Sequence, residues 1–324
     1  MSFLFPASTI TFDAALRDVA SGSPKARAMA AHALGEVSEP AQKRRALDAL
    51  IRALDDDRPE VRAEACSSLG ALEEPSALAP LVKRLGDGAA PVRQNAAIAL
   101  GSLGLADAFD PLAEALREGP ADLRFQAATS LAEIDEKRAY PLLVAALADR
   151  DAQVVAASAL SLGAIGDAAA VAQLTPQLEH ADAATRFDVA YALAELKDSS
   201  GRALLAAAIA DDDRAWDAVT ALGWLDARAE LERALAERKT PQEAAALAAG
   251  HLLRLEPSHE AARHALLGAL TSRKGHVRAL AVEQLEAVGG AWAKPALEKL
   301  ARSGKGVDLL EAIADALRAI ESRI

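Results

Sequence analysis

The phrase PVRQNAAIALGSLG, residues 91–104, decides the fold because the chain repeats it. A similar phrase, VRAEACSSLGAL, begins at Val61, and LRFQAATSLAEI begins at Leu123, equally far from Val92 on its other side. The same interval leads to VVAASALSLGAI from Val154 and to TRFDVAYALAEL from Thr185. Five copies in register, without an insertion, indicate stacked structural units instead of one closed core.

Each copy contains the pattern of an amphipathic helix, which we name the second helix of the repeat. Val61, Ala65, Leu69 and Leu72 follow one another at helical spacing and so lie on one stripe. A first helix precedes it, marked by leucines at one repeat position: Leu50, Leu81, Leu112, Leu143, Leu174 and Leu205. The turn between the two helices usually carries an acidic residue, which suits the start of the second helix as a cap and through its charge.

Weaker copies extend the array in both directions, with Leu34-Gly35 upstream and Leu222-Gly223, Gly250 and Val277-Arg278 downstream. Ala and Leu dominate the composition and aromatic residues make up only 3%, which is typical of helical proteins. The sequence therefore predicts an all-α fold, an α-solenoid of about nine two-helix repeats with a period of roughly 31 residues. We expect an N-terminal cap over 1–22, the repeat array over 23–302 and a C-terminal capping helix over 303–324.

Charge and cysteine content narrow the possible functions. The 324 residues carry a net charge of −11, which disfavours general binding to a phosphate backbone. The single cysteine, Cys66, excludes an intramolecular disulfide and a Cys-based metal site, and its repeat position predicts an inert buried thiol. The chain has no signal-peptide pattern and no apolar run of the ~18 residues that a membrane span needs. We expect a cytoplasmic protein without a membrane span.

The pattern D…VR..AA.ALG.LG, as it stands from Asp87 to Gly104, resembles the short HEAT repeat named after phycobilisome lyase subunits. The resemblance covers roughly residues 23–302 and implies architecture more than activity. It also implies a ladder of bonds between successive repeats, from an Arg of each second helix to a turn Asp. The matching residues here are Arg27, Arg62, Arg93, Arg124, Arg186, Arg278, Asp56, Asp87, Asp149 and Asp211. Val155, Ala215 and Gln242 stand at the Arg position, so we expect the ladder to be interrupted in the middle and weak from the sixth repeat onward.

The sequence contains no convincing catalytic constellation, and we predict no catalytic residue, no metal and no cofactor. The nearest candidate is HEAARH, but His259 and His264 are five residues apart, whereas a zincin places two histidines at i and i+4 on one helix face. Deoxyhypusine hydroxylase is built from similar repeats and assembles iron from several His-Glu pairs. This chain has only His259-Glu260.

Function in such arrays usually lies on the concave surface, which the second helices line. The predicted inner face is unusually rich in aromatic rings for a chain with so few. The residues expected to form a partner-binding groove are Phe125, Leu160, Phe187, Tyr191, Glu195, Trp216, Asp217, Thr220, Trp224, Leu247 and His251. Rings exposed on a surface are typical of interfaces. The alternative is that these rings wedge between neighbouring repeats.

These patterns predict a non-enzymatic scaffold, bacterial and monomeric or weakly oligomeric, that holds a protein segment with apolar anchors and basic residues. An alternative is an enzyme subunit or chaperone that resembles bilin lyases. A more remote alternative is a HEAT-like nucleic-acid-binding protein, which the acidic charge disfavours.

Overall fold

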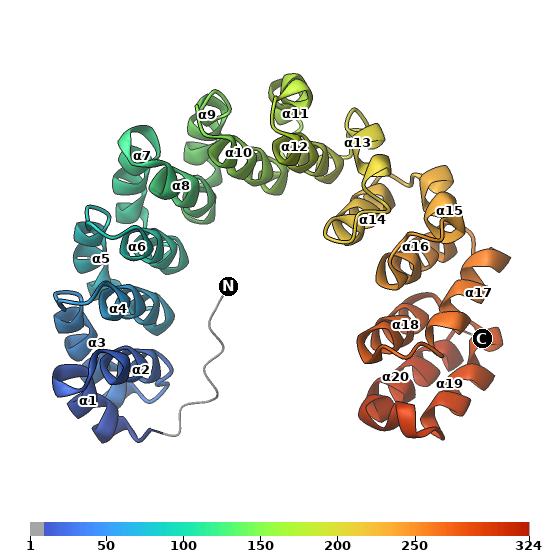
Figure 1. The fold of residues 1–324 in the computed structure, drawn as a ribbon, viewed down its shortest axis with the longest axis horizontal. Coiled ribbons are helices and arrows are strands. Elements are labelled where there is room, and N and C mark those ends of the chain that lie inside the picture. The colour runs from blue at the N-terminus through green and yellow to red at the C-terminus, as the bar shows by residue number, and fades with distance from the viewer. Residues whose placement is uncertain (1–9, 324) are drawn as a thin grey trace. The chain divides into compact units, whose positions relative to one another are not determined.

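The computed structural model describes residues 10–323, and the regular elements within that range are α-helices and short 3-10 helices (Figure 1). This arrangement confirms the all-α solenoid of two-helix repeats that the period predicted. The chain divides into two compact units, Met1–Ile165 and Gly166–Ile324.

In the first unit, first and second helices alternate along the chain. The elements are α1 (Phe12–Ser21), α2 (Pro24–Gly35), α3 (Pro40–Ala53), α4 (Pro59–Leu72), η1 (Pro75–Ala77), α5 (Leu78–Arg84), α6 (Ala90–Leu103), η2 (Ala106–Ala108), α7 (Phe109–Glu118), α8 (Ala121–Ile134), α9 (Glu136–Ala146) and α10 (Ala152–Ile165).

The second unit follows the same order with shorter and less regular helices. Its elements are α11 (Ala170–Leu174), η3 (Thr175–Glu179), α12 (Ala183–Glu195), α13 (Arg202–Ala207), α14 (Ala215–Trp224), α15 (Arg228–Ala236), α16 (Gln242–Leu255), α17 (Glu260–Ala269), α18 (Gly275–Val288), η4 (Ala291–Ala293), α19 (Lys294–Ala301), η5 (Gly304–Leu309) and α20 (Leu310–Glu321).

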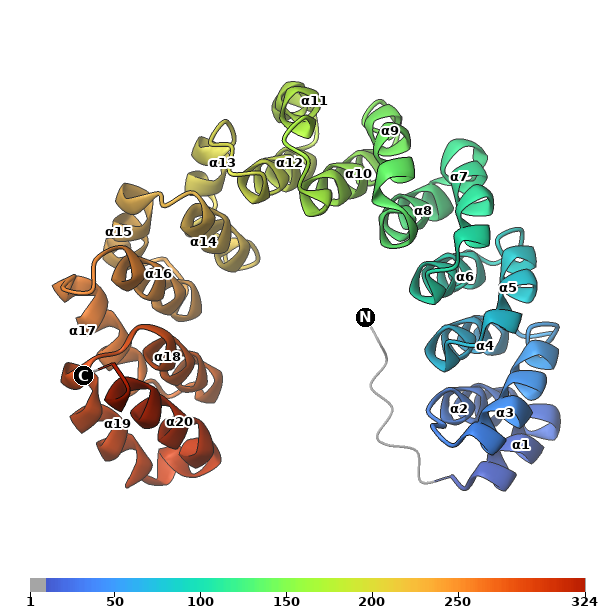
Figure 2. The ribbon, with the colours of Figure 1, turned by 180° about the vertical axis from the view of Figure 1, so that it is seen from behind.

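The second helices keep the period of the sequence. Helices α4, α6, α8, α10 and α12 begin at Pro59, Ala90, Ala121, Ala152 and Ala183, at one constant interval. In the first unit α2, α4, α6, α8 and α10 pack side by side in that order, and Figure 2 shows the same order from behind. In the second unit α12, α14, α16, α18 and α20 do the same. Each second helix therefore buries its stripe against its own first helix and its neighbours in the row.

Leucines of the repeat form the core of both units. Leu50, Leu81, Leu112, Leu143, Leu174 and Leu205 are all inaccessible to solvent, as the recurrence of this position predicted. The core stripe of α4 is equally inaccessible at Val61, Ala65 and Leu69. The Ala-rich composition lets the helices approach closely: a Cβ built on Gly70 would lie 2.9 Å from the Cβ and 3.0 Å from the Cα of Ala99. The glycine in the Leu-Gly pair of the repeat is thus required by helix packing.

None of the helices within residues 10–323 is long and apolar enough to cross a membrane.

Candidate partner-binding surface

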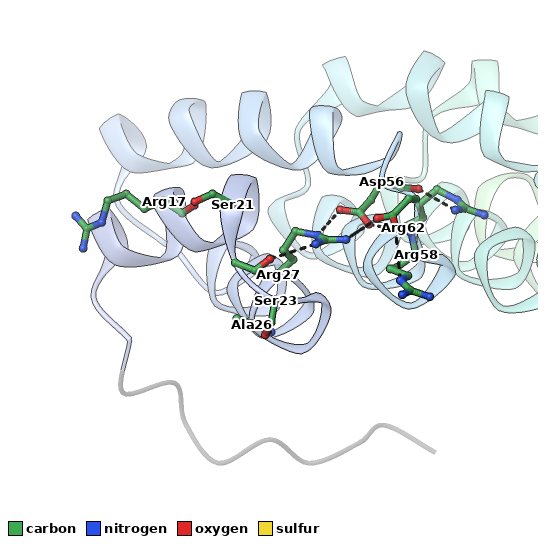
Figure 3. A network of polar contacts seen from close by, with 10 residues as sticks. Arg17, Ser21, Ser23, Ala26, Arg27, Asp56, Arg58 and Arg62 are labelled. Carbon is green, nitrogen blue, oxygen red and sulfur yellow. Dashed lines mark hydrogen bonds and ion pairs between the residues drawn. The ribbon is translucent and has the colours of Figure 1, made fainter.

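Arginine–carboxylate pairs join successive repeats of the first unit, and Figure 3 shows the pair of Arg27 with Asp56. Arg27 donates from Nε and Nη2 to the two carboxylate oxygens of Asp56, both at 2.7 Å. Arg62 makes the same bidentate contact with Asp87, at 2.9 and 2.8 Å. Arg124 also makes a bidentate contact with Asp149, in which both hydrogen bonds measure 2.7 Å. Each arginine lies on a second helix and each aspartate in the turn before the next one, so the pairs hold neighbouring repeats together.

The same aspartates also shape their own turns. Asp56, Asp87, Asp149 and Asp211 each accept a hydrogen bond from the backbone N–H two residues later. The expectation that they cap the second helix directly was wrong for α4 and α6, whose N-cap residues are Arg58 and Ala89. The aspartate orders the turn just outside the helix instead, and this presents its carboxylate to the arginine of the preceding repeat.

The remaining arginines of this set bind other groups. Arg93 donates to Asp122, which lies in the first turn of α8, at 2.8 Å. Arg186 donates to the carbonyl oxygens of His180 and Ala181 at the start of its own repeat, and Arg278 makes the corresponding bonds to Ser272 and Arg273. Among the described residues, the bidentate pairs of an arginine with a turn aspartate are therefore found in the first unit.

Among the predicted groove residues, Phe125 and Leu160 lie in the first unit, where both are half-buried. In the second unit Phe187 and Leu247 are buried, with 7% of each residue exposed. The guanidinium of Arg214 lies over the Phe187 ring, 5.0 Å from its centroid. Phe187 and Leu247 therefore offer little surface to a partner.

Three other aromatic rings of the second unit reach the surface on α12 and α14. Trp216 is 44% exposed, and Tyr191 and Trp224 are half-buried. The Tyr191 and Trp224 rings meet edge to face, with centroids 5.0 Å apart and an interplanar angle of 66°. Because this pair bridges the two helices, the exposed parts of α12 and α14 are continuous there.

Carboxylates surround these rings. On α12, Asp188 and Glu195 lie three residues before and four residues after Tyr191, so all three share one face. Burial raises the pKa of both carboxyl groups, and at Asp188 it outweighs the nearby charge of Arg214. Glu195 and Asp217 in turn raise the pKa of Tyr191, after the larger effect of burial. Within residues 10–323, the carboxylate side chains of Asp188, Glu195 and Asp217 have no ion-pair or hydrogen-bond partner.

We name the exposed parts of these two helices the α12–α14 surface, formed by Asp188, Tyr191, Glu195, Trp216, Asp217, Thr220 and Trp224. Thr220 is half-buried and its hydroxyl donates back to the carbonyl of Trp216 at 2.9 Å, so it fills space on α14 without projecting a free polar group. The surface combines large rings with carboxylates that form no ion pair, which is the chemistry of a site for an apolar and basic segment.

His251, the last predicted groove residue, lies on the neighbouring helix α16. Its ring packs on the backbone of α14, because a Cβ built on Gly223 would come within 2.4 Å of the imidazole. Burial, followed by the charge of Arg254, lowers the pKa of His251 to about 4, so the ring is neutral at neutral pH.

The HEAARH segment has a structural role in this protein. His259 is the N-cap of α17 and accepts a hydrogen bond from the backbone N–H of Ala262, while its Nε2 lies 3.3 Å from Glu232. His264 contacts the carbonyl oxygen of Glu260. In the described part of the chain, no group of three or more His, Cys, Asp or Glu residues is arranged to hold a metal ion.

Comparison with known families agrees with the geometry of the helix pairs. The family model for HEAT repeats matches residues 14–101 and 81–163. The chain contains HEAT repeats over this stretch. The comparison with curated proteins finds no match.

Several solved structures are similar to this protein. A chain of the Kap95:Nup1 complex is 12% identical, with a TM-score of 0.62 over 98% of this HEAT-repeat protein and 52% of that chain. Importin beta is 11% identical, with a TM-score of 0.55 over 95% of this protein and 52% of that chain. A chain of the CpcE–CpcF complex of phycocyanin lyase from Nostoc sp. PCC7120 is 27% identical over 82% of this protein and 97% of that chain, with a TM-score of 0.47.

Sequence reasoning missed two residues that shape the aromatic region. Asp188 could have been found from its spacing to Tyr191 and Glu195 on one helix face. Arg214 could not, because it lies just before α14 and no helical spacing relates it to Phe187 on α12. Only the packing of the two helices brings its guanidinium onto that ring.

Proposed function

We propose that this HEAT-repeat protein is a non-enzymatic scaffold whose α12–α14 surface binds a protein segment. The occupant is an extended or helical segment with an apolar anchor and at least one Lys or Arg. The single observation that supports this most strongly is the exposure of Trp216, 44% of which is open to solvent although the chain has only three tryptophans. Tryptophan exposed on a surface that helical repeats could build from Ala or Ser is typical of an interface anchor.

The charges around Trp216 favour a basic partner. Asp188 and Glu195 are partly shielded from water, and within the described residues neither has a cation at ion-pair distance. A Lys or Arg of the bound segment would supply that cation and could also lie against the Tyr191 or Trp216 ring. The overall charge of −11 adds long-range attraction for a basic segment, which acts mainly on the association rate.

Selection from a display library of random peptides on the intact protein tests this proposal. We expect the selected peptides to be enriched in Lys or Arg next to large apolar residues. Their affinity should fall by about tenfold or more in Trp216→Ala, and by several-fold in Asp188→Asn and Glu195→Gln.

Ile98→Ala is the matched control, because Ile98 is 43% exposed on α6 of the first unit. Selected peptides that are acidic, or that lose equal affinity in Ile98→Ala and Trp216→Ala, would contradict the proposal.

A further inference from the structure

A pocket lies in the second unit where the C-terminal ends of α12, α14 and α16 meet, and it shares Trp224 with the α12–α14 surface. It has a volume of about 650 Å³ and opens to solvent. Trp224 and Leu225 form its apolar wall, and Lys197, Asp226, His251 and Arg254 supply its charged and polar groups.

The backbone shape of the helix ends creates this pocket. Lys197 and Asp226 follow α12 and α14 in the left-handed region, with φ of 61° and 49°. Gly223, in the last turn of α14, leaves the space into which the His251 imidazole packs. A side chain at residue 223 would displace that ring, which lines the pocket.

The two cations of the pocket are engaged only with neutral groups. Lys197 Nζ donates to the carbonyl oxygen of Trp224 at 3.4 Å and lies 5.9 Å from the centroid of that ring. Arg254 approaches His251 Nδ1 at 3.3 Å and Gln284 Oε1 at 3.5 Å. Within residues 10–323, neither cation has a carboxylate within ion-pair distance.

His251 adds a neutral hydrogen-bond donor. Arginine N–H groups only donate, so the contact with Arg254 makes Nδ1 of His251 the acceptor. The neutral ring then carries its proton on Nε2. With one negative charge on Asp226, the pocket has a net charge of +1 at neutral pH.

We propose that this pocket binds the carboxylate of a monoanion whose body is apolar. The guanidinium fork of Arg254 and the ammonium of Lys197 match a carboxylate, and Trp224 with Leu225 covers the apolar body. Asp226 disfavours a dianion such as a phosphate monoester, because its charge leaves only one net positive charge to be neutralised. The proposal does not require a protein segment on the α12–α14 surface, since Lys197, Asp226 and Arg254 lie outside that surface.

Calorimetric titration of the full-length protein with N-acetylphenylalanine and with its amide tests the charge requirement. We expect the acid to bind at least about tenfold more tightly than the amide, with a further loss of about tenfold in Arg254→Gln or Lys197→Gln. Both side chains are exposed, so these variants should fold normally. Arg273→Gln, which changes an exposed arginine outside the pocket, is the matched control and should bind as the parent does.

A second pair of probes distinguishes the sources of the carboxylate. The peptide N-acetyl-Gly-Ser-Gly-Phe, as free acid and as amide, would bind more tightly than N-acetylphenylalanine if the pocket holds a peptide C-terminus, and equally if it holds a small acid. Phenyl phosphate should bind more weakly than either acid. The proposal is overturned if acid and amide bind alike, if neither binds at about 10 mM, or if Arg254→Gln and Lys197→Gln leave the affinity of the acid unchanged.

Discussion

The guanidinium of Arg214 covers the ring of Phe187, 5.0 Å from its centroid, and so removes from the surface a ring whose repeat position predicted exposure. Trp216 stands at the corresponding place of the next second helix and is 44% exposed. The same face of the repeat thus packs its ring in α12 and projects it in α14. The cause is local, because the arginine that precedes α14 lies against α12.

This difference predicts unequal effects on stability. Phe187→Ala should lower the free energy of unfolding by ~3–5 kcal/mol, because it removes a buried ring, whereas Trp216→Ala should change it by no more than ~0.5 kcal/mol. Thermal and denaturant melts of the two variants measure this directly. Equal losses in both would mean that Trp216 packs between repeats as Phe187 does.

Alanine substitutions at two glycines should change the stability of the protein in opposite directions. Gly70→Ala should destabilise the first unit by about 1–3 kcal/mol, because the new methyl group meets the Cα of Ala99 at 3.0 Å and backbone cannot give way. Gly268→Ala should stabilise α17 by up to about 1 kcal/mol, since nothing lies within 4 Å of its Cβ position and alanine is the better helix former. Chemical denaturation of both variants provides the comparison. A stabilised Gly70→Ala would show that α4 and α6 pack less closely than described.

The paired aspartates predict that acid weakens the first unit. Hydrogen bonds from Arg62 and Arg124 hold the pKa values of Asp87 and Asp149 below the usual 3.8. A carboxyl group whose pKa is lower in the folded state contributes stability above its unfolded pKa and loses it as the pH falls through the folded value. Asp149→Asn should therefore lose stability at pH 7 and show a smaller further loss between about pH 5 and pH 3 than the parent.

Hydrogen exchange of amides in α8 and α10 localises this effect to the joined repeats. Parallel pH dependence in the variant and the parent would remove Asp149 as its source.

Binding at the α12–α14 surface should lose strength at a higher pH than binding at an ordinary carboxylate site. Burial raises the pKa of Asp188 and of Glu195, so both become protonated at a higher pH than exposed carboxyl groups do. As the pH falls, the affinity for a basic peptide should therefore begin to decrease at a higher pH than it would at a site of exposed carboxyl groups. Titrations at several pH values compare the parent with Asp188→Asn plus Glu195→Gln, which should have the weaker affinity throughout and a flatter profile. An unchanged profile would mean that these carboxylates do not face the peptide.

The thiol of Cys66 should be unreactive in the folded protein. It is fully buried, and burial raises its pKa to about 12, so only about 10⁻⁴ of it would be thiolate at pH 8. Alkylation by iodoacetamide, followed by mass spectrometry, should be slow in buffer and rapid in denaturant. Equal rates would show that α4 opens readily from its neighbours.

The period of the sequence was sufficient to predict most of the fold. Leu50, Leu81 and Leu112 recur with the repeat, and a residue that recurs on one stripe of every helix is buried when equivalent helices stack. The starts of α4, α6 and α8 follow for the same reason, because local helix signals and the period agree. Where the period loosens, the sequence predicted a weaker arginine–aspartate ladder, but not that Arg186 and Arg278 donate to backbone carbonyl oxygens of their own repeats.

The candidate surface depended on contacts that no single helix determines. Helical spacing placed Phe187, Tyr191 and Trp216 on one predicted face, but their exposure differs because Arg214 covers the first, Trp224 meets the second and solvent reaches the third. The pocket at Lys197 and Arg254 required two left-handed turns and the space above Gly223. The sequence by itself determined the repeat, its helices and its core, since these follow from spacing along one chain segment. Only the tertiary structure decided which side chains remain open to a ligand, because exposure depends on the neighbouring helix that packs against each of them.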